Sequence, residues 1–167
     1  MDHKTDPNPD LVRIYALIKP HYLREITMNN AQLERFKDNF KDFRQADWSQ
    51  LGEFYADDIV FKDPVHELRG LVILEDYFTA LCANLVDCRF EYLDQVVSDD
   101  SAYLKWIMHF RHPRLGKDLI DVRGVSNLRW SDKIDFHEDF YDMGAMLYEQ
   151  LPVLGNVTRW LRLRLAS

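Results

Sequence analysis

The chain is short of cysteine and of basic residues, and both shortages limit what it can be. Its two cysteines, Cys82 and Cys88, lack the CxxC spacing of metal sites. We expect both to be reduced thiols in the core of a cytoplasmic protein. Lys and Arg number 21 against 28 Asp and Glu, which gives a formal net charge of −7. Because phosphate binding needs a basic surface, this charge argues against general affinity for nucleic acid.

Long apolar runs are also absent. No stretch approaches the roughly 20 apolar residues of a membrane span, and residues 1–7 lack the basic and apolar regions of a signal peptide. We therefore expect a soluble, cytoplasmic protein. The chain has 167 residues, of which 47% are hydrophobic and 29% charged, as is typical of one globular domain with a substantial core.

The first half of the chain has helical periodicity. Apolar residues recur at spacings of three and four over residues 28–44, 48–55 and 71–85, which predicts three helices. Another short helix is predicted over residues 11–18. A β-branched and aromatic strand, Ile59–Asp63, lies between the second and third of the main helices.

After Asp87 the apolar period changes to two. The predicted strands cover residues 88–97, 102–112, 117–130 and 133–142, with hairpin turns at 98–101 and 131–132. Helices followed by a run of antiparallel strands indicate an α+β fold, with the helices packed on one face of the sheet.

Alternation along the strands predicts which side chains face the helices. One inner set is Leu104, Trp106, Met108 and Phe110, and the next is Ile120, Val122, Gly124, Ser126, Leu128 and Trp130. The last strand is ambiguous. His137, Asp139 and Tyr141 share one face, while Phe136, Glu138 and Phe140 share the other, so either choice puts charge inside.

Asp63 ends the first strand and is followed by Pro64. The proline pushes Asp63 into an extended conformation, which holds its carboxylate beside a loop. Catalytic groups are often found at such positions on a rigid scaffold. Asp-Pro is also a common start of a turn, so a purely structural role stays open.

Two segments resemble known families. Residues 55–65, from Tyr55-Ala56-Asp57-Asp58 to Asp63-Pro64-Val65, resemble bacterial ketosteroid isomerases, and residues 133–142 resemble the last strand of SnoaL-like polyketide cyclases. Both families belong to the nuclear transport factor 2-like superfamily. This resemblance implies a cone-shaped α+β fold, with helices packed over a curved antiparallel sheet that encloses an apolar cavity. It covers about residues 27–145, with residues 1–26 and 146–167 as an N-terminal extension and a C-terminal helical extension.

The same resemblance implies functional residues. Asp63 matches the general base of the isomerases, Asp139 the catalytic aspartate of the cyclases, and Tyr141 a residue that lines the cavity, which places His137 inside as well. Asn39 and Ser126 stand where the isomerases have an oxyanion-hole tyrosine and a second acid, so that constellation is altered here. We therefore expect Asp63, Asp139 and His137 to be catalytic, and Asn39, Trp106, Ser126, Leu128 and Tyr141 to bind ligand.

The implied chemistry is proton transfer by an aspartate general base on a hydrophobic carbonyl compound or lipid, as in an isomerase, cyclase or dehydratase. We expect no cofactor and no metal, because His109 and His112 fall on opposite strand faces and no HExxH spacing occurs. Two alternatives stay open: a carrier of a hydrophobic ligand without catalysis, or an interaction domain. Because superfamily relatives often dimerise through the outer sheet face, the resemblance also implies a homodimer through that face. His137 could also be a structural, hydrogen-bonded core residue.

The C-terminal segment is the second unusual feature. Residues 152–167 contain Arg159, Arg162 and Arg164 and no acidic residue, and their leucines recur at helical spacing. One interpretation is a final helix that packs across the domain or a neighbour. The other is a basic amphipathic helix in weak contact with an anionic membrane surface or an acidic partner.

Overall fold

The computed structural model describes residues 30–165, and over this range the chain forms five α-helices and a six-stranded sheet. The helices are α2 (Asn30–Lys41), α3 (Leu51–Phe54), α4 (Leu71–Ala83), α5 (Met143–Met146) and α6 (Pro152–Leu165), with 3-10 helices η1 (Trp48–Gln50) and η2 (Tyr148–Gln150). The strands are β1 (Tyr55–Lys62), β2 (Glu67–Arg69), β3 (Asp87–Val97), β4 (Ser101–Arg111), β5 (Ile120–Trp130) and β6 (Ile134–Tyr141). The predicted helix over residues 11–18 and the predicted extension 1–26 lie outside the described residues.

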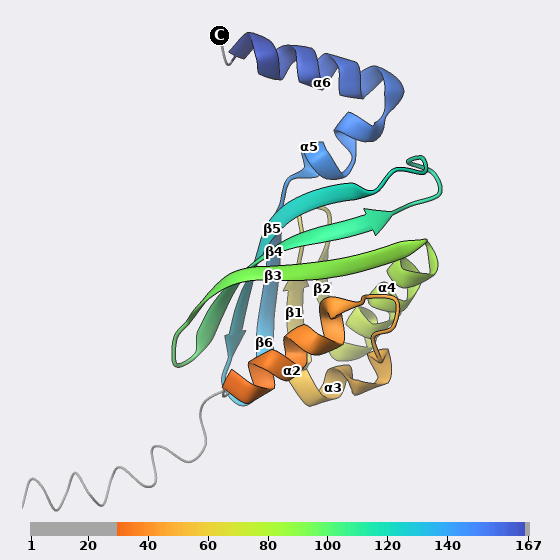
Figure 1. Cartoon of the computed structure of the whole chain (residues 1–167). Coiled ribbons are helices and arrows are strands. Elements are labelled where there is room, and N and C mark those ends of the chain that lie inside the picture. The colour runs from red at the N-terminus through yellow and green to blue at the C-terminus, as the bar shows by residue number, and fades with distance from the viewer. Residues whose placement is uncertain (1–29, 166–167) are drawn as a thin grey trace, which may run out of the picture.

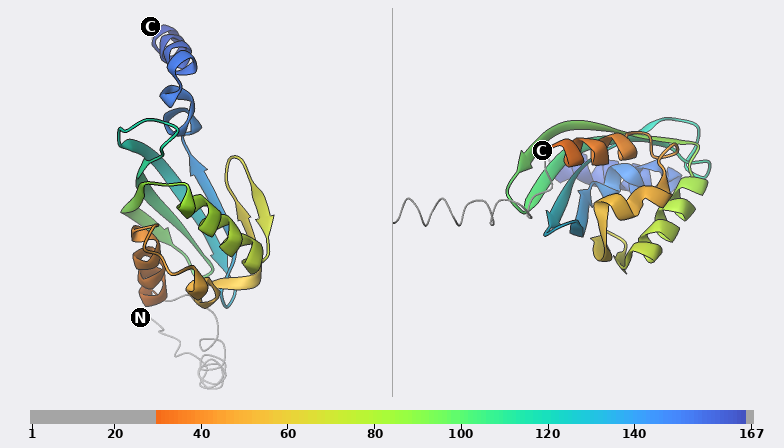
Figure 2. Two further views of the ribbon diagram at one scale, coloured as in Figure 1. Left: turned by 90° about the vertical axis from the view of Figure 1, so that its right-hand side faces the viewer. Right: turned by 90° about the horizontal axis from the view of Figure 1, so that it is seen from below.

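The sheet has the strand order β2-β1-β6-β5-β4-β3 and curves around α2, α3 and α4 (Figures 1 and 2). Neighbouring strands are antiparallel except β1 and β6, which pair in parallel. The predicted α+β architecture is confirmed. The sheet is mixed, however. After β1 the chain forms β2, α4 and the antiparallel strands β3, β4 and β5, and it then enters the sheet as β6, which runs parallel to β1.

The core lies between the helices and the concave face of the sheet (Figure 2). Leu33, Phe36 and Phe40 bury one side of α2, as the spacing of three and four predicted. The inner sets predicted for β4 and β5 are likewise buried, except Met108, which is half-buried.

A β-bulge decides which side of β6 faces the core. Arg129 pairs with Phe136 while Trp130 pairs with Ile134, so Asp135 is an extra residue in β6. The bulge lets Ile134 and His137, three positions apart, both be buried. His137, Asp139 and Tyr141 consequently lie on the concave face, and Phe140 is exposed on the convex face.

Several element boundaries differ from the sequence-based prediction, and one strand was not predicted. Tyr55 is the first residue of β1 rather than the end of a helix, because its backbone pairs with Ile134. β5 begins at Ile120 rather than at residue 117, since the preceding loop turns at Gly116, whose φ is +112°. β2 was not predicted, because three residues are too few to show a period.

The C-terminal segment leaves the sheet and does not cross it (Figure 1). Pro152 opens α6, where its missing N–H is not needed. α6 packs on η2 at Gly155, where an added Cβ would lie 2.4 Å from the backbone oxygen of Glu149. A helix over this segment is confirmed, whereas its predicted packing across the domain is not what the structure shows. No helix within residues 30–165 is long and apolar enough to span a membrane.

The convex face of the sheet carries charged side chains and exposed apolar or aromatic ones, among them Leu93, Val96, Tyr103 and Phe140. These side chains provide apolar surface of the kind that the predicted homodimer requires. Dimerisation through this face stays a prediction.

Gly124 on β5 should be intolerant of a side chain. A Cβ placed there would lie 2.2 Å from Cη2 of Trp106, whose ring occupies the space above the glycine. We expect Gly124→Ala to lower the free energy of unfolding by about 1–3 kcal/mol, the usual cost of overpacking. Urea unfolding measures this loss. Adding Trp106→Phe should restore part of the lost stability, since the smaller ring leaves room for the new methyl group. If the stability losses of the two single variants simply add in the double variant, the explanation is contradicted.

Candidate functional site

A cavity of about 380 Å³ lies between α4 and the concave face of the sheet. Its walls are mostly apolar and aromatic, and two carboxylates, Asp63 and Asp139, both line it. The other wall residues are Phe43, Phe61, Tyr77, Phe78, Leu81, Leu85, Cys88, Phe90, Trp106, Met108, Phe110 and Tyr141. The loop before β5 and the segment after β6 complete the lining with His112, Arg114, Leu115, Met146 and Leu147.

Only one of the two carboxylate oxygens of Asp139 is hydrogen-bonded within residues 30–165. Ser126 Oγ donates to Asp139 Oδ1 at 2.5 Å, and His137 Nε2 lies 2.9 Å from the same oxygen. Trp106 Nε1 in turn donates to Ser126 Oγ at 2.9 Å. Within residues 30–165 no group donates to the second oxygen, Oδ2. The Asp139 side chain is 20% exposed, so one carboxylate oxygen is available to a molecule in the cavity.

His137 connects Asp139 to a buried phenol. Because the carboxylate only accepts, His137 Nε2 carries the hydrogen of that contact, and in the neutral ring Nδ1 accepts from Tyr55 OH at 2.8 Å. Burial raises the pKa of Tyr55 well above its ordinary value, and the charge of Asp139 raises it further, so the phenol stays a donor. Tyr55, His137 and Asp139 thus form one relay that ends at the cavity.

Asp63 is held on both sides. Its Oδ1 accepts from the backbone N–H groups of Val65 and His66, each at 2.7 Å, and Tyr77 OH donates to Oδ2 at 2.7 Å. His66 Nδ1 lies 3.2 Å from both oxygens. The side chain is only 5% exposed. Asp63 therefore lines the cavity and also closes the turn between β1 and β2. The turn role of Asp-Pro is confirmed, and a catalytic role of Asp63 stays a prediction.

Two phenols complete the polar part of the cavity. Burial raises the pKa of Tyr141, and the negative charges of Asp63 and Asp139 raise it further. Burial also raises the pKa of Tyr77, together with its hydrogen bond to Asp63. Both therefore remain neutral donors near neutral pH. The hydroxyl of Tyr77 is already used, whereas within residues 30–165 no group forms a hydrogen bond with that of Tyr141.

The remaining predicted site residues are spread over different places. Trp106 and Tyr141 line the cavity, and Ser126 contacts it through Asp139. Ser126 and His137 border a second, smaller pocket of about 40 Å³ beneath α2. Leu128 is fully buried in the core and does not line the cavity.

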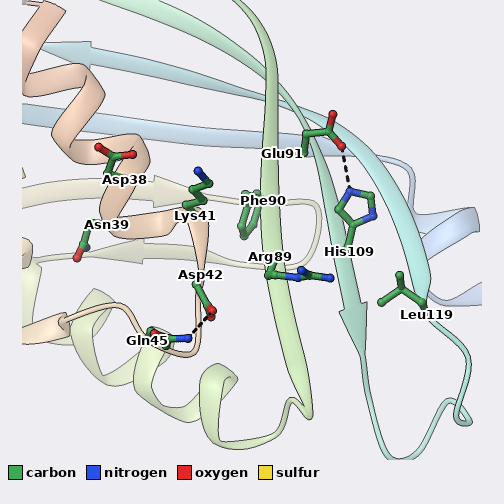
Figure 3. A pocket seen from close by; sticks show the side chains of 10 residues that line it. All are labelled: Asp38, Asn39, Lys41, Asp42, Gln45, Arg89, Phe90, Glu91, His109 and Leu119. Atoms are coloured by element: carbon green, nitrogen blue, oxygen red, sulfur yellow. Dashed lines mark hydrogen bonds and ion pairs between the residues drawn. The ribbon is translucent and has the colours of Figure 1, made fainter.

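Asn39 lies outside the cavity. It borders a groove between the end of α2 and the edge of the sheet, together with Asp42, Arg89 and His109 (Figure 3). Its side-chain oxygen accepts from the backbone N–H of Asp47 at 3.4 Å. The structure does not bring Asn39 to Asp139, because α2 turns this side chain away from the aromatic stripe that faces the core.

His109 at the same groove forms a charge cluster on the outer sheet face (Figure 3). Its Nδ1 lies 2.7 Å from Asp121 and its Nε2 3.3 Å from Glu91. The hydrogen bond to Asp121, followed by that to Glu91, raises the pKa of His109 above its ordinary value.

His109 should make stability depend on pH. A raised pKa in the folded state means that the stabilisation is complete below the unfolded pKa of about 6.5 and is lost as pH rises through the folded pKa. The cluster is largely exposed, so the effect should stay below about 1 kcal/mol. Urea unfolding of the wild type and His109→Gln at about pH 6 and about pH 8.5 measures it. The difference between the two proteins should shrink at the higher pH, and a constant difference would contradict this assignment.

The two cysteines lie in or near the core. Cys88 is buried and Cys82 half-buried, and both are free thiols. Burial raises the pKa of Cys88 to about 12, which keeps it protonated and unreactive.

Among residues 30–165 no three His, Cys, Asp or Glu side chains are grouped so that they could hold a metal ion.

Sequence analysis missed two tyrosines of the site: Tyr77, which donates to Asp63, and Tyr55, which donates to His137. A polar atom on an otherwise apolar stripe was the available signal for Tyr77, which follows Leu74 and precedes Phe78 and Leu81 on α4. Tyr55 had no such signal, because the bulged register between Tyr55 and Val60 hides its position in the strand.

Comparison with known proteins identifies the family. A SnoaL-like domain model matches residues 33–134, which is more than half of the chain. A search of curated proteins gave no match.

Solved structures with the same fold are numerous, but their sequences are distant. A proposed SnoaL-like polyketide cyclase from Shewanella putrefaciens is 19% identical with a TM-score of 0.59, over 70% of this chain and 81% of that one. A nuclear transport factor 2-like protein of unknown function from Burkholderia pseudomallei is 11% identical with a TM-score of 0.61, over 69% and 93%. A protein with a ketosteroid isomerase-like fold from Catenulispora acidiphila, in complex with trimethylamine, is 14% identical with a TM-score of 0.57, over 63% and 82%. These structures share the nuclear transport factor 2-like fold with this chain, and the match over residues 33–134 shows that the chain belongs to the SnoaL-like domain family.

Proposed function

We propose that the protein is a proton-transfer enzyme of the isomerase, cyclase or dehydratase type, acting on an apolar carbonyl compound or lipid. The observation that carries this proposal is Asp139, a carboxylate at an apolar cavity with one oxygen held by Ser126 and His137 and the other open. A carboxylate oxygen that no donor of the protein occupies can accept a proton from a molecule bound in the cavity.

In the proposed step, Asp139 Oδ2 takes a proton from the carbon beside the substrate carbonyl. The C–H electron pair moves into the carbonyl group and produces an enolate. The protonated carboxyl then returns the proton to another carbon in an isomerisation, or to a departing hydroxyl in a dehydration. In a cyclisation the enolate carbon attacks a second carbonyl, and the resulting alkoxide receives the proton. One such transfer contributes about 10²–10⁴ in rate.

The negative charge that develops on the substrate oxygen needs a hydrogen-bond donor to stabilise it. Tyr141 fits this role, because it lines the same cavity and its hydroxyl is unused within residues 30–165. Burial and both carboxylates raise its pKa, so the hydroxyl keeps its proton. A donor already in place stabilises the enolate more than water would.

Asp63 has a different role in this proposal from the one that the isomerase resemblance implies. Its two oxygens already accept from Val65, His66 and Tyr77, so little accepting capacity is left for a substrate proton. We assign Asp63 to holding the turn and orienting Tyr77, and Asp139 to the proton transfer.

A carrier of a hydrophobic ligand is the second candidate. Two observations favour it: the cavity is lined mostly by apolar side chains, and Asp63 is already hydrogen-bonded within the protein. Such a cavity would bind an apolar ligand without reacting with it. A carrier leaves its ligand unchanged, whereas the proposed enzyme exchanges a proton with solvent at the carbon beside the carbonyl.

Ligand capture followed by exchange in heavy water separates the two candidates. The purified full-length protein is incubated with cell extract, and the bound apolar molecules are identified by mass spectrometry. The captured compound is then incubated in D2O with and without protein. Faster deuterium uptake or a changed product with protein supports the enzyme. Binding with neither uptake nor turnover makes the protein a carrier.

A further inference from the structure

We propose that α6 is a docking helix for an anionic lipid surface. This proposal concerns a part of the molecule remote from the catalytic relay and does not depend on the reaction proposed for the cavity. It starts from the way α6 extends away from the sheet beyond α5 (Figure 1).

One side of α6 is exposed and mostly apolar, with Arg164 in the same arc. At 100° per residue, six apolar residues fall within less than half of the helix circumference, and each is between 45% and 87% exposed. They are Val153, Leu154, Val157, Trp160, Leu161 and Leu165. An exposed apolar stripe of this kind on a soluble domain marks a contact surface.

The other side of α6 makes the contacts with the rest of the chain. Gly155 is buried against η2, and Arg162 forms an ion pair with Glu149. The apolar stripe therefore points away from η2, and no described residue covers it.

Charge favours a lipid surface over other partners. Residues 152–167 hold three arginines and no acidic residue, although the whole chain carries −7. Anionic lipid attracts such a segment. A second copy of the helix would instead bring three more arginines against it, and like charges across a contact repel.

The aromatic and basic residues also suit the interface between lipid and water. Trp160 lies in the stripe, and tryptophan prefers that depth in a membrane. The guanidinium of Arg164 lies 5.3 Å from the centroid of the Trp160 ring. Arginine can lay its methylene groups along the apolar surface while its charged end reaches the headgroups.

The position of α6 gives the contact a use. Met146 of α5 and Leu147 line the cavity, and η2 joins them directly to α6. Binding through α6 would bring this side of the cavity toward the membrane, from which an apolar ligand could enter.

Vesicle co-sedimentation of the full-length protein tests the proposal. One set of vesicles is phosphatidylcholine alone, and the other contains equal parts of phosphatidylcholine and phosphatidylglycerol. We expect at least about tenfold stronger binding to the anionic vesicles, weakened by added salt because salt screens charge. Absence of binding, or equal binding to both sets, overturns the proposal.

Two variants of the same helix separate the apolar contact from the charge. Leu161→Glu changes the stripe, and Leu163→Glu makes the same change on the opposite side, where the leucine is 68% exposed. Both lower the charge equally. We expect Leu161→Glu to bind anionic vesicles about tenfold more weakly than Leu163→Glu, since only Leu161 is buried in lipid. Equal binding contradicts the docking geometry.

Light scattering without vesicles tests whether another copy covers the stripe. The wild type and Leu161→Glu should have the same mass. If Leu161→Glu dissociates a larger assembly, the stripe is a protein contact and the lipid proposal is wrong. Circular dichroism confirms that both variants keep their helices. Deuterium exchange by lipid-free protein reports on the cavity separately, so failure of either proposal can be recognised without the other.

Discussion

Asp139→Asn should lower turnover of the captured ligand by about 10²–10⁴, the usual contribution of one positioned proton acceptor. The amide cannot take a proton from carbon, but its oxygen can still accept from His137 and Ser126 as Asp139 Oδ1 does. The relay to Tyr55 should therefore remain in place, and ligand affinity should change little. Turnover and deuterium uptake are measured under saturating ligand.

The matched variants for this test are Asp63→Asn and Glu138→Gln. Asp63→Asn keeps an oxygen for the backbone N–H groups of the turn, so we expect less than about a tenfold loss. Glu138 lies on the other side of β6, so its variant should behave as the wild type. A larger loss in Asp63→Asn than in Asp139→Asn would return the base to Asp63 and refute our assignment of roles.

Tyr141→Phe should lower turnover by about 10²–10³, which is the cost of removing one donor to a developing oxyanion. Its ring would still fill the same wall of the cavity, so ligand affinity should be nearly unchanged. The separate measurement of kcat and KM checks this, because loss of an interaction made only in the transition state lowers kcat and leaves KM largely unchanged.

Tyr103→Phe is the control for Tyr141→Phe. Tyr103 is exposed on the convex face of the sheet, so removal of its hydroxyl should leave turnover unchanged. Equal turnover of wild type and Tyr141→Phe would show that another group stabilises the substrate oxygen. A matching rise in KM without a change in kcat would make Tyr141 a binding residue only.

Much of the fold could be predicted because local patterns suffice for it. The stripe of Leu33, Phe36 and Phe40 predicts α2, and the alternation from Leu104 to Phe110 predicts β4 with its inner face. Both patterns are repeated over many residues, so one irregularity does not hide them. β2 has only three residues, too few for a period.

The candidate site could be predicted only in part, because its hydrogen bonds join segments that are far apart in the sequence. Residue type and position at a strand end indicated Asp63, and the resemblance to the cyclases indicated Asp139; both line the cavity. Their hydrogen-bond partners could not be predicted. Tyr77 comes from α4, and Tyr55 meets His137 across 82 positions of sequence, so only packing of distant segments brings these groups together.

The amino-acid sequence by itself determined the helices, most strands, the absence of basic character outside the C-terminal segment, and the two acids near strand ends. These properties depend on residue type and on neighbours within one element. Tertiary structure decided the parallel pairing of β1 with β6, the bulge at Asp135 that turns His137 inward, and the unequal hydrogen bonding of the two aspartates. It also decided that the apolar side of α6 is left uncovered. Each of these depends on contacts between elements far apart in the chain, and spacing along one strand or helix carries no information about them.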